Sequence, residues 1–241
     1  MALLRDGALE SSSVVANCAM NRERGLTGSN GYGRELGLDP VAELRGRLGH
    51  PTRPVRWLDL CCGSGRALSE AARLSGAAGL AERVEIVGVD LVDHFATSPH
   101  AGVRLVTASV TDWTPQAGHL FDLVTCVHGL HYVGDKLGVL TRAASWLAPD
   151  GVLAASFDVA SVRGADGKPV GRPLTTALRS AGFGYDARSR RITHRGRGEV
   201  TLPFEYLGAD DQAGPNYTGQ PAVNSHYSPA AREPVRGHVQ V

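Results

Sequence analysis

Short apolar runs alternate with helix-like stretches through the middle of the chain. Five runs of strand length are rich in aliphatic residues: 55–60, 84–90, 103–108, 121–128 and 152–157. Helical stretches with an apolar face lie between some of them, at residues 66–74 and 135–147. Strands that alternate with helices form a parallel sheet through right-handed crossovers. The pattern therefore predicts an α/β fold with a doubly wound, mostly parallel sheet.

An antiparallel hairpin is predicted to complete this sheet. Residues 183–194 and 199–207 have strand character, and Arg195-Gly196-Arg197-Gly198 separates them as a turn. Together with the five parallel runs, these two segments make a seven-stranded sheet. Arginines are concentrated on the hairpin. They form either a solvated edge or a docking surface for an acidic peptide or RNA.

Both ends of the chain are predicted to extend a central domain at residues 51–207. Residues 1–50 form an arm and one helix, which begins at Asp39-Pro40 because Asp39 can cap it and Pro40 is preset for its first turn. The arm is either mobile or a lid that closes over a ligand. Residues 208–241 are rich in Gly, Pro and Asn. We predict that they form an irregular tail, and we hypothesise that this tail folds over the site.

The composition limits the kinds of partner. A length of 241 residues suits one α/β domain with extensions, and a net charge of +1 provides no global field for nucleic acid or an anionic membrane. Cys18, Cys61, Cys62 and Cys126 form no CxxC pair, as expected for reduced thiols. No signal-peptide core or apolar run of membrane-spanning length is visible. We predict a cytoplasmic protein that binds neither nucleic acid nor membrane.

The first apolar run leads into a small-residue turn that suits a ligand. Residues 57–68 read WLDLCCGSGRAL, which predicts a strand, a tight turn and the start of a helix. Unpaired N–H groups at a helix N-terminus can hold the negative end of a ligand, and Gly63 and Gly65 let the backbone approach it closely. The second run ends in Asp90, which is placed for the two hydroxyls of a ribose. Together these features indicate a nucleoside-containing ligand.

The two motifs resemble those of the class I S-adenosylmethionine (SAM) dependent methyltransferases, and the resemblance covers about residues 55–160. In that family the glycine turn lies under the methionine half of SAM, and the acid that ends the second strand binds the ribose. A fold that binds NAD is the alternative. The NAD fingerprint, however, has a third glycine where this chain has Leu68, and Asp59 suits an ammonium group better than a pyrophosphate. SAM is therefore the predicted cofactor of a Rossmann-like domain.

The resemblance implies a set of cofactor-binding residues at strand ends and on the arm. At the place of Ser109 the family often has an acid that binds the adenine amino group; serine can still accept a hydrogen bond there, and Asp112 either replaces the acid or caps a turn. On the arm, Tyr32 and Arg34 are candidates by position. The predicted cofactor-binding residues are Tyr32, Asp59, Cys61, Gly63, Gly65, Asp90, Leu91, Ser109, Val110, Cys126 and His128.

Two histidines follow the fourth run, where the resemblance places the transferred methyl group. A histidine can deprotonate a hydroxyl or an amine near neutral pH, so His128 and His131 are the predicted catalytic residues. The alternative is a packing role, with His128 against the cofactor and His131 against the next helix. Their spacing also suits a metal ion, but the sequence suggests no third ligand nearby, so we predict no metal site.

The predicted function is methyl transfer to an oxygen or nitrogen of a small molecule, such as a metabolite or a natural-product intermediate. The family's base- and glutamine-modifying branches carry an Asn/Asp-Pro-Pro-Tyr/Phe segment after the fourth strand, and Thr125-Cys126-Val127-His128 does not match it. A peptide or protein methyltransferase and a SAM-binding protein with other chemistry are the alternatives. The predicted partner is a small-molecule substrate, and a homodimer is a possible assembly.

Overall fold

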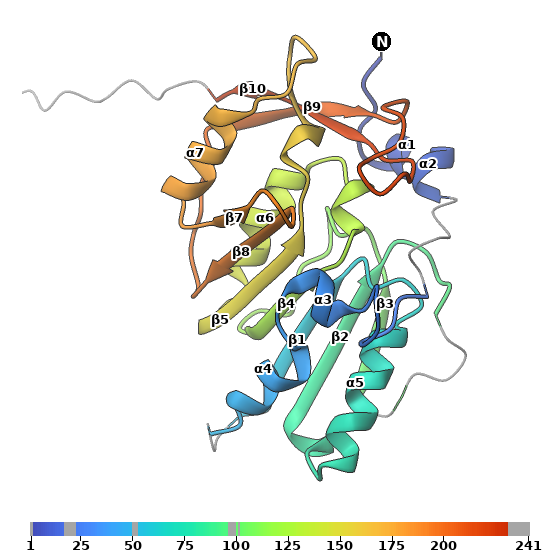
Figure 1. Cartoon of the computed structure of the whole chain (residues 1–241), viewed down its shortest axis with the longest axis vertical. Helices are drawn as coiled ribbons and strands as arrows, with labels where there is room; N and C mark the ends of the chain where they lie inside the picture. The colour runs from blue at the N-terminus through green and yellow to red at the C-terminus, as the bar shows by residue number, and fades with distance from the viewer. Residues whose placement is uncertain (1, 17–22, 50–52, 96–99, 101, 231–241) are drawn as a thin grey trace, which may run out of the picture.

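A seven-stranded, mostly parallel sheet forms the centre of the molecule (Figure 1). The computed structural model describes residues 2–16, 23–49, 53–95, 100 and 102–230. The strands lie in the order β3-β2-β1-β4-β5-β8-β7, and the last two pairings are antiparallel. In chain order they are β1 (Val55–Leu60), β2 (Val84–Asp90), β3 (Val103–Thr107), β4 (Phe121–Cys126), β5 (Leu147–Ser156), β7 (Gly184–Asp186) and β8 (Arg191–Arg195). This topology confirms the predicted α/β, Rossmann-like doubly wound fold.

Helices cover both faces of this sheet because successive strand residues point to opposite sides. Trp57 and Ile86 belong to one buried apolar cluster, on the side of α3, α4 and α5. Leu58 and Val87 belong to the other, on the side of α6 and α7. The helices are α3 (Tyr32–Leu36), α4 (Pro40–Gly46), α5 (Arg66–Ala77), α6 (Lys136–Ser145) and α7 (Arg172–Ser180), with short 3₁₀ turns η1 (Ala81–Arg83), η2 (Gly129–His131) and η3 (Val159–Ser161).

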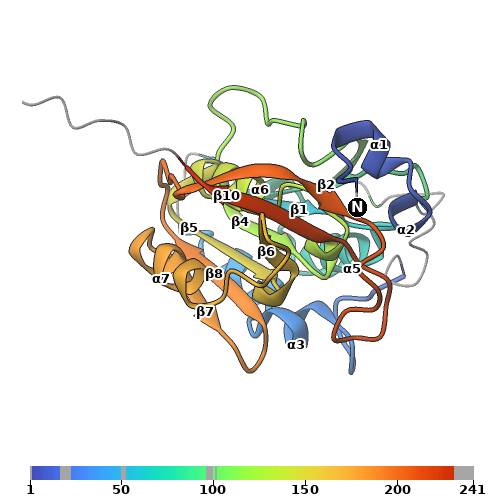
Figure 2. The ribbon, with the colours of Figure 1, turned by 90° about the horizontal axis from the view of Figure 1, so that it is seen from above.

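A second, three-stranded sheet lies above the main sheet in Figure 1, and Figure 2 shows its strands running across the ends of the main strands. Its order is β6 (Val162–Gly164), β10 (Asn224–Pro229) and β9 (Phe204–Asp210). The N-terminal helices α1 (Asp6–Glu10) and α2 (Ser13–Ala16) lie beside it. Leu4 pairs with Ala209 of β9, so the N-terminal segment is joined to this second sheet.

An antiparallel hairpin completes the main sheet as predicted, but its two strands lie almost entirely within residues 183–194, which were predicted as a single strand. The hairpin consists of β7 and β8, and the turn between them lies at residues 187–190. The carboxylate of Asp186 shapes this turn by accepting hydrogen bonds from the backbone N–H groups of Arg188 (2.9 Å) and Ser189 (3.3 Å). The predicted second strand at 199–207 is wrong because β9 begins at Phe204 and belongs to the other sheet.

The prediction that residues 208–241 are irregular is wrong for the end of β9 and for all of β10. Strand β10 has a hydrogen-bonded neighbour on each side, β6 and β9. Its Tyr227 is buried, and the Tyr227 hydroxyl donates to Oδ1 of Asp135 at 3.0 Å. The sequence of β10, NSHYSP, carries little aliphatic character, so its strand conformation comes from these long-range contacts.

Local signals in the first half of the chain agree with the structure. The side chain of Asp39 accepts a hydrogen bond from the N–H of Val41 at 2.9 Å and caps α4, as predicted. Cys18, one of the cysteines expected to be reduced, lies outside the described residues. Among the helices that the structure describes, none has the length and apolar character needed to cross a membrane.

Candidate active site

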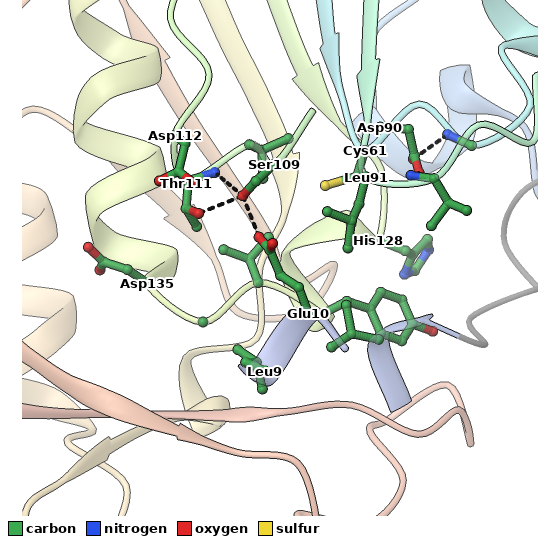
Figure 3. Close-up of a pocket in the computed structure, with 18 of the residues that line it drawn as sticks. Leu9, Glu10, Cys61, Asp90, Leu91, Ser109, Thr111, Asp112, His128 and Asp135 are labelled. Atoms are coloured by element: carbon green, nitrogen blue, oxygen red, sulfur yellow. Dashed lines mark hydrogen bonds between the residues drawn. The ribbon is translucent and has the colours of Figure 1, made fainter. Parts of the chain in front are cut away.

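A cavity opens at the carboxyl ends of β1, β2, β3 and β4 (Figure 3). Its volume is about 220 Å³. A second cavity, beside α5 and η1, has about 10 Å³, which is little more than the space of one water molecule. The strand order reverses between β1 and β4, and open α/β sheets bind ligands at such a switch point. The larger cavity is therefore the candidate ligand site.

The turn after β1 brings backbone close to this cavity. Cys61, Gly63 and Gly65 have positive φ values of 58°, 60° and 73°. A Cβ atom at Gly65 would lie 2.9 Å from the side chain of Leu105, so the site requires glycine there. Cys61 and Gly63 line the cavity, whereas Gly65 caps α5 behind it.

Asp90 ends β2 and is held by backbone donors from two segments. Its Oδ2 accepts a hydrogen bond from the N–H of Gly63 at 2.8 Å, and its Oδ1 accepts one from the N–H of Val92 at 3.2 Å. These bonds fix the carboxylate at the cavity wall, next to Leu91. A carboxylate oxygen has two lone pairs, so an oxygen that accepts a backbone hydrogen bond can also accept one from a ligand hydroxyl.

Asp59 lies behind the cavity wall, although the resemblance implied a cofactor contact. Its side chain is fully buried. The carboxylate accepts hydrogen bonds from the hydroxyl of Tyr32 (2.7 Å) and from that of Thr125 (2.5 Å), which itself accepts from the indole N–H of Trp57. Burial raises the pKa of Asp59 to about 7, against the opposing effect of the Thr125 and Tyr32 hydrogen bonds, and the charge of Asp90 adds to the rise. Tyr32 and Asp59 therefore hold the N-terminal segment against β1.

At the end of β3, a hydroxyl network faces the cavity. Ser109 donates a short hydrogen bond to the carboxylate of Glu10, which comes from α1 (Figure 3). The same Ser109 oxygen lies 2.6 Å from the hydroxyl of Thr111 and accepts a hydrogen bond from the Thr111 N–H at 3.2 Å. Ser109, Thr111 and Glu10 all line the cavity, together with Asp112. This wall is thus polar and rich in oxygen acceptors.

His128 stands where β4 gives way to η2, in the left-handed conformation with φ 58°. Its Nε2 lies 3.0 Å from Oε2 of Glu35 on α3, and its Nδ1 lies 3.3 Å from Nε2 of His131. The hydrogen bond from His128 lowers the pKa of Glu35. Burial, with the charges of His128, Lys136 and Arg190, lowers the pKa of His131 to about 3. Glu35, His128 and His131 therefore form one chain of hydrogen-bonding groups, in which both histidines are buried.

Tyr217 packs against the two histidines from the segment between β9 and β10. Its ring centroid lies 5.3 Å from that of His131 and 6.3 Å from that of His128. The guanidinium of Arg190 lies over the same ring, 3.9 Å from its centroid. A segment predicted to be an irregular tail thus supplies a side chain next to the predicted catalytic pair.

The structure brings many of the predicted residues to one cavity and leaves others behind it. The cavity-lining ones are Cys61, Gly63, Asp90, Leu91, Ser109, Val110 and His128. The predicted residues that do not line it are Tyr32, Asp59, Gly65, Cys126 and His131. Of these, Tyr32 donates a hydrogen bond to Asp59, Gly65 caps α5, and His131 lies next to His128. Arg34, the second candidate of the arm, is exposed on α3. Whether SAM contacts each residue stays a prediction.

Sequence reasoning missed the residues that cover the cavity. Leu9, Glu10 and Val15 from the N-terminal helices line it, as does Tyr206 from β9. Glu35 was also missed as the partner of His128. Leu9 and Val15 are apolar residues in a polar stretch, which is a weak signal that this stretch packs against something. No local signal marks Glu10 or Glu35, because their partners lie far away in the sequence.

A glycine turn follows the first strand, and the second strand ends in a carboxylate that can bind ribose hydroxyls. These two features define a nucleoside-binding α/β domain. The sequence matches the family described as "Methyltransferase domain" over residues 32–188, which is more than half of the chain. The chain belongs to this family, the class I SAM-dependent methyltransferases. The family assignment inferred from the two motifs is thereby confirmed.

Curated relatives match part of the chain. A trans-aconitate 2-methyltransferase of Acidovorax sp. (strain JS42) is 31% identical over 121 residues, which are 48% of this chain and 42% of that protein. A ubiquinone biosynthesis O-methyltransferase of Neisseria meningitidis serogroup C is 28% identical over 124 residues, 48% of this chain and 46% of that protein. The match thus spans less than half the length of these relatives.

Solved structures show more distant similarity. The CurJ carbon methyltransferase has a TM-score of 0.44 and 16% identity, with 62% of this chain and 50% of that chain covered. CalS10, an amino pentose methyltransferase from Micromonospora echinaspora, has a TM-score of 0.35 and 26% identity, with 49% of each chain covered.

Proposed function

We propose that this protein transfers a methyl group from SAM to an oxygen or nitrogen of a small molecule, such as a metabolite or a natural-product intermediate. One observation carries the proposal: Gly63, Asp90 and Ser109, from three separate turns of a methyltransferase-family domain, line a single cavity. When bound, SAM supplies a methyl group that its sulfonium charge has already activated.

The residues of the cavity fit such a cofactor. The carboxylate of Asp90 has acceptor capacity for two neighbouring ribose hydroxyls, and Gly63 allows backbone approach without a side chain in the way. Asp90, Glu10, Asp112 and Asp135 all line the cavity. Four acidic side chains favour a ligand with positive charge over one that carries a pyrophosphate.

We assign proton removal from the methyl acceptor to the pair His131 and His128. Of the two, His128 lines the cavity, with its Nε2 beside Glu35 and its Nδ1 beside Nε2 of His131. His128 takes up the acceptor's proton, and His131 behind it orients the His128 ring. The positive charge comes to rest on His128, beside the Glu35 carboxylate, which stabilises it.

Two relatives favour a small acceptor: a trans-aconitate 2-methyltransferase and a ubiquinone biosynthesis O-methyltransferase. The loop after β5 supports the same choice: it contains only the short β6 and η3 before α7, so no substrate domain is inserted there. We propose that residues 1–50 act as a lid, since Leu9, Glu10 and Val15 cover the cavity.

Calorimetry with the demethylated product S-adenosylhomocysteine (SAH) tests the binding part of this proposal. We expect Asp90→Ala to weaken SAH binding at least tenfold, because the ribose hydroxyls lose a charged acceptor. Asp93→Ala is the matched control, since Asp93 is exposed and outside the cavity wall. Equal affinity of Asp90→Ala and the unaltered protein would overturn the proposed site.

Transfer of a labelled methyl group across candidate acceptors tests the reaction itself. Carboxylate, hydroxyl and amine small molecules should include the acceptor. Labelling of peptides alone would instead assign a peptide or protein methyltransferase. Tight SAH binding without transfer to any acceptor would contradict the methyltransferase proposal and favour a SAM-binding protein with other chemistry.

A further inference from the structure

The carboxylate of Glu10 enters the cavity from an element that the domain motifs do not include. Glu10 is the last residue of α1, near the N-terminus, and it meets the exit of β3 through the hydroxyl of Ser109. Among the described residues, no lysine, arginine or histidine forms an ion pair with this carboxylate within 4.0 Å. A half-buried carboxylate that is oriented by one hydroxyl and has no cation partner there is ready to accept hydrogen bonds from a ligand.

The hydroxyl of the neighbouring serine is already engaged in hydrogen bonds. Because Ser109 donates its single proton to Glu10, the Thr111 hydroxyl must be the donor in the 2.6 Å contact between Ser109 and Thr111. The Thr111 N–H also donates to the Ser109 oxygen. Both lone pairs of that oxygen are then in use. In this arrangement the acceptor capacity at this wall lies with Glu10, and the contact between Ser109 and adenine stays a prediction.

The position of Glu10 relative to Asp90 defines which part of a nucleoside it meets. β3 lies next to β2 in the sheet, and Asp90 ends β2 while Ser109 follows β3. A nucleoside whose ribose binds Asp90 therefore extends its base toward the β3 exit. The edge of adenine offers an exocyclic amino group at C6 with two N–H donors, which a carboxylate satisfies; a 6-oxopurine has a carbonyl at that position instead.

We propose that Glu10 accepts a hydrogen bond from the exocyclic amino group of the cofactor's adenine and so selects adenine over 6-oxopurines. This assignment rests on the proposed SAM site. It gives the N-terminal helix α1 a defined role, because the residue that reads the base then comes from the cover of the cavity and not from the domain's own β3 turn.

The test is a comparison of two ligands by calorimetry: SAH and S-inosyl-L-homocysteine, in which a carbonyl replaces the amino group. The unaltered protein should prefer SAH at least tenfold, since the carbonyl would face the Glu10 carboxylate. In Glu10→Gln the preference should fall to within about threefold, because the amide can turn its N–H toward the carbonyl. Asp112→Asn tests the other acid considered for this contact, and it should keep the full preference if Glu10 binds the amino group. Asp93→Asn, exposed and outside the cavity wall, is the matched control.

Each outcome is decisive. Glu10→Gln with an unchanged preference, an unaltered protein without preference, or loss of the preference in Asp112→Asn would each overturn the role of Glu10. Failure of the unaltered protein to bind SAH would instead overturn the proposed function. Thermal unfolding of the ligand-free variants, expected to match that of the unaltered protein within a few degrees, separates a binding effect from a folding defect.

Discussion

The hydroxyl of Tyr32 lies 2.7 Å from Oδ2 of Asp59 and donates a hydrogen bond to this fully buried carboxylate. The bond links helix α3 of the N-terminal segment to β1, at the centre of the sheet. An acid that seemed from its sequence position to face a ligand is thus used to anchor the arm. The consequences of this contact are measurable.

Removal of the Tyr32 hydroxyl should destabilise the protein. Tyr32→Phe leaves the buried Asp59 carboxylate with one fewer donor, and an unsatisfied buried group costs about 1–3 kcal/mol. Chemical denaturation would measure the free energy of unfolding. Tyr217→Phe is the control because Tyr217 is 37% exposed, and it should change stability by less than about 0.5 kcal/mol. Equal stability of the two variants would contradict the anchoring role of Tyr32.

Asp59 should also make stability depend on pH. Burial raises its pKa from 3.8 to about 7, so between these values the folded protein binds more protons than the unfolded chain. The contribution of Asp59 to stability is therefore fully present below about pH 4 and is lost as the pH rises to about 7. A single group can contribute a slope of at most about 1.4 kcal/mol per pH unit.

Asp59→Asn removes this titration, so its free energy of unfolding should fall less steeply over the same pH range. Asp93→Asn, at an exposed position, should follow the unaltered protein. Parallel curves for Asp59→Asn and the unaltered protein between pH 4 and pH 7 would show that Asp59 does not titrate as its burial predicts.

Glu35 should act on the reaction through His128. Loss of the carboxylate in Glu35→Gln removes the partner that stabilises a protonated His128, so kcat should fall by about 10- to 100-fold while SAH affinity stays unchanged. Glu82→Gln, at an exposed position, is the control and should keep the full kcat. An unchanged kcat in Glu35→Gln would contradict the assigned role.

The contact between Glu35 and His128 should also make stability depend on pH. The hydrogen bond from His128 lowers the pKa of Glu35 below its usual 4.5, so the stabilising contribution of Glu35 is present above about pH 4.5 and is lost as the pH falls through the lowered value. The unaltered protein should therefore be more stable than Glu35→Gln at pH 7, and this difference should shrink in acid. Chemical denaturation at pH 7 and at a pH below 4.5 measures this difference in the free energy of unfolding.

Lys136 should be essential for the attachment of the C-terminal strand. Its buried ammonium group donates to the carbonyls of Val133 (3.1 Å) and Val223 (2.9 Å) and to the hydroxyl of Ser225 (2.7 Å). Lys136→Met removes all three bonds and leaves buried acceptors without a donor, which should cost about 2–4 kcal/mol. Lys168→Met changes an exposed lysine and should be neutral. Similar melting temperatures for both variants would show that Lys136 contributes little.

The main sheet was predictable because its signals are local. β1 and β2 have the predicted bounds, since each is an apolar run bounded by turn residues. The second sheet was not predictable, because β6 has three residues and β10 is mostly polar. Their strand conformation depends on pairing between segments about 60 residues apart, as in the register of Ser225 with Val162. Sequence patterns carry no information on such pairings.

The candidate site divides in the same way. Gly63, Asp90 and His128 follow predictable strands, so their convergence could be inferred from topology alone. Glu10 and Glu35 reach the site from short N-terminal helices of five residues each. Helices this short have no periodic signal, and each carboxylate is recognised only through a partner about 93 to 99 residues away.

The pairing of Leu4 with Ala209 has a consequence for synthesis on the ribosome. The parallel strands β1 to β5 are complete once residue 156 has emerged, but the cavity lining also includes Leu9 and Tyr206, which precede and follow these strands in the sequence. An emerging chain therefore has the strand-end turns of the cavity before Tyr206 and the rest of β9 are available to cover them.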